Sequence, residues 1–150
     1  MSGVFDKLQR STICELLVSG ALAIHGSSSA LAKIGSTAYF MIDGQVYSKT
    51  TADCAALAGT VTNAKFNVFV FSINAAGTFA TQMGTEAATL GGVVFPSVAD
   101  GYVALGFVIV NPTGTGNFVG GSTNLDDATV VPNAVYINTV GDFFPQYATL

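Results

Sequence analysis

Charged residues are scarce in this chain. Only 9% of its 150 residues are Asp, Glu, Lys or Arg, whereas 50% are hydrophobic, and roughly 25% charged residues is usual for a soluble domain. A soluble monomer normally relies on surface charge to stay dispersed. We therefore expect neighbouring subunits to cover much of the surface; the alternative is a monomer coated with Ser, Thr, Asn and Gly.

Basic residues are the scarcer of the two charged classes. The chain has five Lys and Arg residues against nine Asp and Glu, which gives a net charge of −4. Binding to nucleic-acid phosphates requires clustered Lys and Arg, and the basic residues here are scattered along the sequence. We therefore expect no nucleic-acid partner.

Cysteine, histidine and tryptophan are nearly absent. The two cysteines, Cys14 and Cys54, are too far apart in sequence for a zinc motif or a disulfide framework. We expect two buried free thiols, with a single disulfide as the alternative. The one histidine, His25, has no Cys or acidic residue beside it in the sequence and is expected to be a polar loop residue. The lack of Trp argues against a sugar-binding role, because Trp commonly stacks on sugars.

No apolar run is long enough to cross a bilayer, which needs about 20 residues. The longest candidate, ICELLVSGALAI over residues 13–24, superficially resembles the core of a secretion signal. Glu15 interrupts that run. We therefore expect neither a signal peptide nor a membrane span.

The first part of the chain has helical spacing. Apolar residues recur at intervals of three and four over residues 4–24, which predicts a short helix or a helix-like arm with one apolar side. The Gly-Ser-Ser-Ser run at residues 26–29 is typical of a flexible link. The sequence thus predicts an arm and linker over residues 1–35 and a β-domain over residues 36–150.

The rest of the chain has strand-like character. Asp43-Gly44 lies between two β-rich segments, and this dipeptide is a strong signal for a two-residue hairpin turn. Residues 65–73 are predicted to form a central strand that turns at residues 74–77 into a second hairpin. Further strands are expected at residues 93–96, 102–110, 117–119 and 135–137. A single helical turn is expected over residues 54–59, capped by Asp53 and ended by Gly59.

This pattern predicts an all-β fold, an antiparallel β-sandwich or Greek-key barrel with a short N-terminal helical arm. The chain has no interleaved helices of the length that a parallel α/β sheet requires.

Few residues suggest chemistry. The adjacent Asp126 and Asp127, with nearby Asn and Thr, could bind Ca²⁺; alternatively one caps a turn and the other faces water. The Gly114-Thr-Gly116 and Gly120-Gly121 stretches lack the Lys and the following helix of a phosphate loop, so we interpret them as tight turns. We expect no active site, no metal and no cofactor.

Four segments resemble the small, β-rich head decoration proteins, also called cement proteins, of tailed bacteriophages. They are FMIDGQVYSKTTAD (40–53), KFNVFVF (65–71), ALGFVIVNP (104–112) and FVGGSTNLDD (118–127). The resemblance implies a trimer on the capsid exterior, bound where major capsid subunits meet. It also implies that an N-terminal arm or a C-terminal tail reaches the capsid or a neighbouring copy. The residues we expect to make these contacts are Val4, Phe5, Leu8, Leu16, Leu17, Phe143, Phe144 and Tyr147; packing within the domain is the alternative for each.

Two other functions compete with this one. The first is a phage tail or fibre module that binds a glycan on the host surface, which exposed Tyr residues and Asn or Asp clusters in loops would support. The second is a metal-assisted hydrolase that uses Asp126 and Asp127. We expect a virion structural protein rather than an enzyme.

Overall fold

The structure is a computed structural model that describes residues 14–140. Within this range the chain forms twelve strands and one turn of 3-10 helix, η1 (Leu90–Gly92), and it contains no α-helix. The strands are β1 (Cys14–Val18), β2 (Leu22–Ile24), β3 (Ala32–Ile34), β4 (Ala38–Ile42), β5 (Gln45–Lys49), β6 (Ala52–Asp53), β7 (Thr60–Val61), β8 (Asn67–Asn74), β9 (Phe79–Met83), β10 (Tyr102–Val110), β11 (Phe118–Val119) and β12 (Val135–Asn138).

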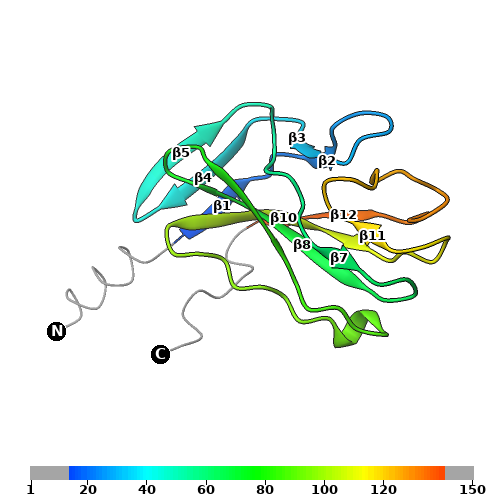
Figure 1. Ribbon diagram of the computed structural model, residues 1–150. Helices are drawn as coiled ribbons and strands as arrows, with labels where there is room; N and C mark the ends of the chain where they lie inside the picture. Colours follow the sequence, from blue (N-terminus) through cyan, green and yellow to red (C-terminus); the bar gives the residue numbers. More distant parts are fainter. Residues whose placement is uncertain (1–13, 141–150) are drawn as a thin grey trace.

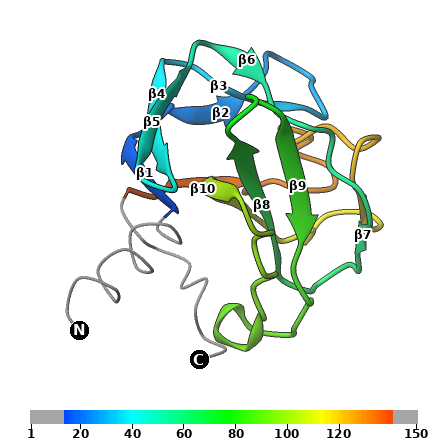
Figure 2. The same cartoon turned by 90° about the vertical axis from the view of Figure 1, so that its left-hand side faces the viewer.

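The strands form four small sheets. Their strand orders are β1-β4-β5, β12-β10-β8-β9, β11-β7 and β2-β3-β6, and every paired strand runs antiparallel to its neighbour. The long strands β8 and β10 cross the middle of the molecule (Figure 1). Seen from the side, β8 and β9 lie next to each other, with β2, β3 and β6 beyond one end of the pair (Figure 2). The predicted all-β, antiparallel class is confirmed.

The β4–β5 hairpin forms where the Asp-Gly dipeptide predicts it. Asp43 and Gly44 have φ angles of 52° and 80°, and both positive values suit the two-residue turn whose twist matches that of the flanking strands. Ile42 pairs with Gln45 across the turn, and the register continues without a break to Ala38 and Lys49.

Strands β8 and β10 are the centre of the fold, as their apolar sequences predict. In β8, residues 67–73 are all buried, because one face of the sheet meets the main core and the other meets a second cluster. The large inward side chains include Phe69, Phe71 and Leu105. The second cluster joins Val68, Val70 and Phe107 under residues of the 93–98 segment.

A β-bulge in β10 adjusts its pairing with β8. The register shifts between Ala104 and Gly106. Gly106 has a φ of 150°, and a Cβ built on it would lie 2.4 Å from the Ile137 carbonyl oxygen of β12. The close approach of these two backbones therefore requires glycine at this position.

The helical arm is wrong for the described part of its range. Residues 14–18 and 22–24 form β1 and β2, and β1 pairs with β4 in the middle of the chain. Residues 1–13 lie outside the described residues. Residues 14–34 are therefore built into the sheets, and the arm-and-linker region predicted to end at residue 35 is not separate from the β-domain over that stretch.

The helical turn predicted at residues 54–59 is also wrong, because the segment has no regular secondary structure. The Cys54 amide donates to the Ala32 carbonyl at 2.9 Å, and the Ala55 carbonyl accepts a hydrogen bond from the Thr81 hydroxyl at 2.7 Å. These bonds to distant strands replace the local bonds that a helical turn would make. The predicted extended piece at residues 93–96 is reduced to a single bridge between Val94 and Thr85.

Both cysteines are free and buried, as the sequence predicts. Burial raises the pKa of each thiol, to about 12 for Cys54. Since the thiolate is the reactive form of cysteine, both groups are expected to be chemically inert at neutral pH.

Candidate functional site

A group of exposed apolar side chains lies on the sheet β1-β4-β5. Alternate residues of each strand point away from the core, and on this sheet many of them are hydrophobic. We call this surface the outer face; it comprises Leu17, Val18, Tyr39, Met41 and Val46. The exposed fractions are 38% for Leu17, 49% for Val18, 45% for Tyr39 and 62% for Val46, and Met41 is half-buried.

The register makes the outer face continuous. Tyr39 lies opposite Val18 on one side and Ser48 on the other, and Met41 lies between Glu15 and Val46. A register shift in β1 between Leu16 and Val18 puts Leu17 and Val18, which are consecutive in sequence, on the exposed side together. Glu15 is the single charged side chain among these paired positions. Contiguous exposed apolar surface of this kind marks sites of interaction with another surface.

The structure separates the residues predicted to make contacts. Leu16 is 0% exposed and packs in the main core. For this residue the structure therefore shows the alternative, packing within the domain. Leu17 is on the outer face. The other six, Val4, Phe5, Leu8, Phe143, Phe144 and Tyr147, lie outside the described residues. Sequence reasoning missed Tyr39 and Val46, whose alternation with the buried Phe40 and the half-buried Tyr47 was a signal for an exposed apolar face.

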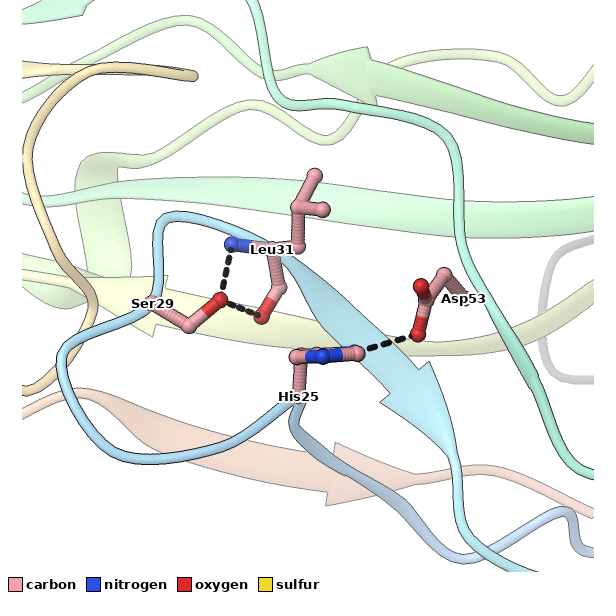
Figure 3. Close-up of polar contacts among 4 residues, drawn as sticks. All are labelled: His25, Ser29, Leu31 and Asp53. Atoms are coloured by element: carbon pink, nitrogen blue, oxygen red, sulfur yellow. Dashed lines mark hydrogen bonds and ion pairs between the residues drawn. The ribbon is translucent and has the colours of Figure 1, made fainter.

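His25 has an acidic partner that its sequence neighbours do not show. Its Nδ1 atom lies 2.5 Å from Oδ1 of Asp53, and the side chains are 50% and 48% exposed. Figure 3 shows the pair together with Ser29, whose hydroxyl bonds with the backbone of Leu31. The Ser29 hydroxyl is therefore engaged by its own loop, and the arrangement gives no support for nucleophilic catalysis.

The two adjacent aspartates act separately. Oδ2 of Asp126 accepts a hydrogen bond from the Ser28 amide at 2.8 Å, and Oδ1 of Asp127 accepts from the Thr129 amide and hydroxyl at 2.9 and 2.6 Å. Both carboxylates thus bind backbone of the surrounding loops. Over residues 14–140 no three His, Cys, Asp or Glu side chains are grouped so that they could hold a metal ion.

The glycine-rich stretches form turns, as predicted. The Asn63 side-chain amide donates to the carbonyls of Pro112, Gly114 and Gly116 at 3.0, 2.9 and 3.0 Å. Gly114 lies so close to the Thr129 carbonyl that a Cβ could not fit. The loop is therefore held by its own protein partners.

Two exposed carboxylates predict a dependence of stability on acid. Hydrogen bonds from Thr62 lower the pKa of Glu86, and those from Thr129 lower the pKa of Asp127. A carboxylate whose pKa is lower in the folded state stabilises the fold above its unfolded pKa, and that contribution is lost as pH falls through the folded pKa. We expect the urea midpoint to fall as the pH is lowered below about 4.5.

Glu86→Gln should remove part of the fall in urea midpoint at low pH, and Asp127→Asn should remove another part. Urea titrations at several values between about pH 5 and pH 2 measure both effects. Thr62→Val, which removes one of the two donors to Glu86, serves as the graded control. A decline of unchanged size in both carboxylate variants would show that other groups cause it.

No described helix is long and apolar enough to span a membrane. Comparison of the chain with protein-family models, with curated proteins and with solved structures found no match in any of the three.

Proposed function

We propose that this chain is a structural virion protein that decorates and stabilises a bacteriophage capsid shell, with the major capsid protein as its partner. The observation that carries the proposal is the outer face: several apolar side chains exposed at neighbouring positions of one three-stranded sheet. A nearly uncharged sheet face suits permanent contact with another protein, since the buried part of an interface is depleted of charged residues.

The low charge of the whole chain supports the same role. With 9% charged residues, the protein has few groups to keep an apolar sheet face dispersed in water. In the proposed role the protein acts on the exterior of the virion, associates with copies of itself as a homotrimer, and has no catalytic activity or cofactor. Its sheets are proposed to form a β-sandwich. Binding several capsid subunits at once would add avidity to contacts that are individually weak.

The test compares two lysine substitutions at equally exposed valines. Val46 on the outer face and Val94 outside it are 62% and 60% exposed, so neither change should disturb folding. We expect Val46→Lys to abolish cosedimentation with purified shells of the virus that encodes this chain, because it places a charge in the contact. Val94→Lys should bind like the wild type. Equal binding by both variants would exclude the outer face as the contact surface.

A second comparison tests the N-terminal segment, residues 1–13, which is the part of the predicted arm that lies outside the described residues. Deletion of residues 1–13 leaves β1 intact, whereas a longer deletion would remove a strand that pairs with β4. Loss of shell binding by this deletion would assign the contact to the arm, and retained binding would remove the arm from the proposal.

The alternative function is a tail or fibre module that binds a host-surface glycan. One observation favours it: Tyr39 is 45% exposed on the outer face, where an aromatic ring could stack on a sugar. A glycan array distinguishes the two functions, because Tyr39→Ala should abolish any sugar binding while no sugar binding at all is expected of a shell protein.

A further inference from the structure

Within the described residues, 14–140, strand β5 is a free sheet edge. It pairs with β4 on one side, and across residues 14–140 no other backbone hydrogen bond reaches residues 45–49. The opposite edge of the same sheet, β1, packs against β10. An unpaired edge presents a row of N–H and C=O groups that can pair with another strand.

The hairpin turn determines which groups of β5 point outward. In a β-turn the carbonyl of the first residue bonds the amide of the fourth, so Gln45 bonds back to Ile42 across Asp43-Gly44. Bonding residues alternate along an antiparallel ladder. Gln45, Tyr47 and Lys49 therefore bond to β4, and the backbone groups of Val46 and Ser48 point away from the sheet.

The usual features that protect an edge strand are weak here. The β4–β5 register has no bulge, and QVYSK contains no proline. Its single charged residue, Lys49, has its ammonium group 5.5 Å from the centre of the Phe79 ring. The cation is thus directed toward a ring of its own chain. Natural edges are more often blocked by prolines, bulges or several charges.

We propose that the free edge of β5 pairs with β5 of a second copy of this chain, antiparallel about a two-fold axis at Tyr47. The partner is a second copy because the edge of β5 is complementary to itself in an antiparallel pairing. The outward N–H and C=O groups of Val46 and Ser48 in one copy meet the same groups of the other copy. Only this register pairs all five residues, with Val46 opposite Ser48 and Gln45 opposite Lys49 of the second copy. The two lysines lie at opposite ends, so no like charges face each other.

The pairing joins two three-stranded sheets into one continuous antiparallel sheet of six strands. The two outer faces then become one wider apolar surface. Because the contact is one short strand on each side, it buries less than the roughly 800 Å² per partner of a standard interface. The dimer is therefore expected to dissociate on dilution. The inference does not depend on the proposed function: the two-fold contact joins free chains in solution, whereas the proposed homotrimer assembles on the capsid shell.

The first test is sedimentation equilibrium of the full chain over a wide range of concentration. The wild type is expected to pass from monomer to dimer. Ser48→Pro removes an outward N–H without touching the β4 ladder, and proline is tolerated on an edge strand whose N–H faces solvent. It should weaken the dimer at least tenfold. Ser48→Ala, which keeps the backbone donor, should dimerise like the wild type, and circular dichroism shows whether both variants are folded.

The second test changes charge without changing the backbone. Gln45→Lys places a lysine opposite Lys49 of the second copy and should weaken the dimer; Gln45→Glu places an acid there and should strengthen it. The two effects should have opposite signs and shrink at high salt.

Val46→Lys separates edge pairing from packing of one outer face on another. Its side chain lies on the face and not in the edge, so edge pairing predicts a dimer that persists. A wild type that stays monomeric, an oligomer that survives Ser48→Pro, or one that is lost with Val46→Lys would overturn the proposal. A Val46→Lys variant that still dimerises and still binds shells like the wild type would overturn the proposed function alone.

Discussion

Replacing Gly106 with alanine is expected to lower the free energy of unfolding by about 3 kcal/mol. The added Cβ would lie 2.4 Å from the Ile137 carbonyl oxygen, and Gly106 has a φ of 150°. The obstruction is backbone and not the end of a flexible side chain, so β10 and β12 must move apart. The loss of their pairing is then added to the strain of an unfavourable φ.

Urea denaturation followed by fluorescence or circular dichroism measures this effect. Gly91→Ala is the matched control, because a Cβ at Gly91 meets no atom within 4 Å, and its effect should stay within about 0.5 kcal/mol. Equal stability of the two variants would show that β10 and β12 do not approach each other this closely.

Phe69→Ala is expected to destabilise the protein by about 3–5 kcal/mol, because it opens a cavity in the main core. Phe69 and Phe118 are both 0% exposed, and their rings meet edge to face with centroids 5.7 Å apart and planes at 61°. The substitution removes buried apolar area and this ring contact together. Phe118 comes from β11, so the change also weakens the attachment of the β11-β7 pair.

Phe95→Ala is the control of the same chemical type, measured by the same urea titration. Its ring also makes an edge-to-face contact, with Phe107 at 4.9 Å, but 39% of the residue is exposed. We expect a loss well below that of Phe69→Ala. A comparable loss would mean that the second cluster, which contains Phe107, contributes as much to the free energy of unfolding as the main core does.

Features specified by neighbouring residues could be predicted from the sequence. The Asp43-Gly44 turn needs positive φ at two adjacent positions, and this dipeptide provides them without help from the rest of the chain. Strands β8 and β10 are continuous apolar runs, and a strand buried on both faces requires such a run.

Features decided by distant partners could not be predicted. Residues 14–24 satisfy a helical spacing as sequence, but β1 pairs with β4 and β2 with β3, and a short apolar run does not distinguish helix from strand. The same limit applies to the outer face. Its continuity depends on the register shift in β1, and register follows from long-range pairing. The partners of His25 and Asp126 likewise come from segments far away in sequence.

The bond between the Leu22 amide and the Asn138 side chain, 2.7 Å long and spanning 116 positions, has a consequence for synthesis. Leu125 similarly donates its amide to the Ser29 carbonyl. Strand β2 and the Ser29 loop therefore lack these partners until residues 125–138 have been synthesised. Folding of these segments should therefore wait for residues 125–138 and proceed at the slower rates of proteins dominated by non-local pairing. Until then the exposed strands depend on dilution or chaperones to avoid pairing with other chains.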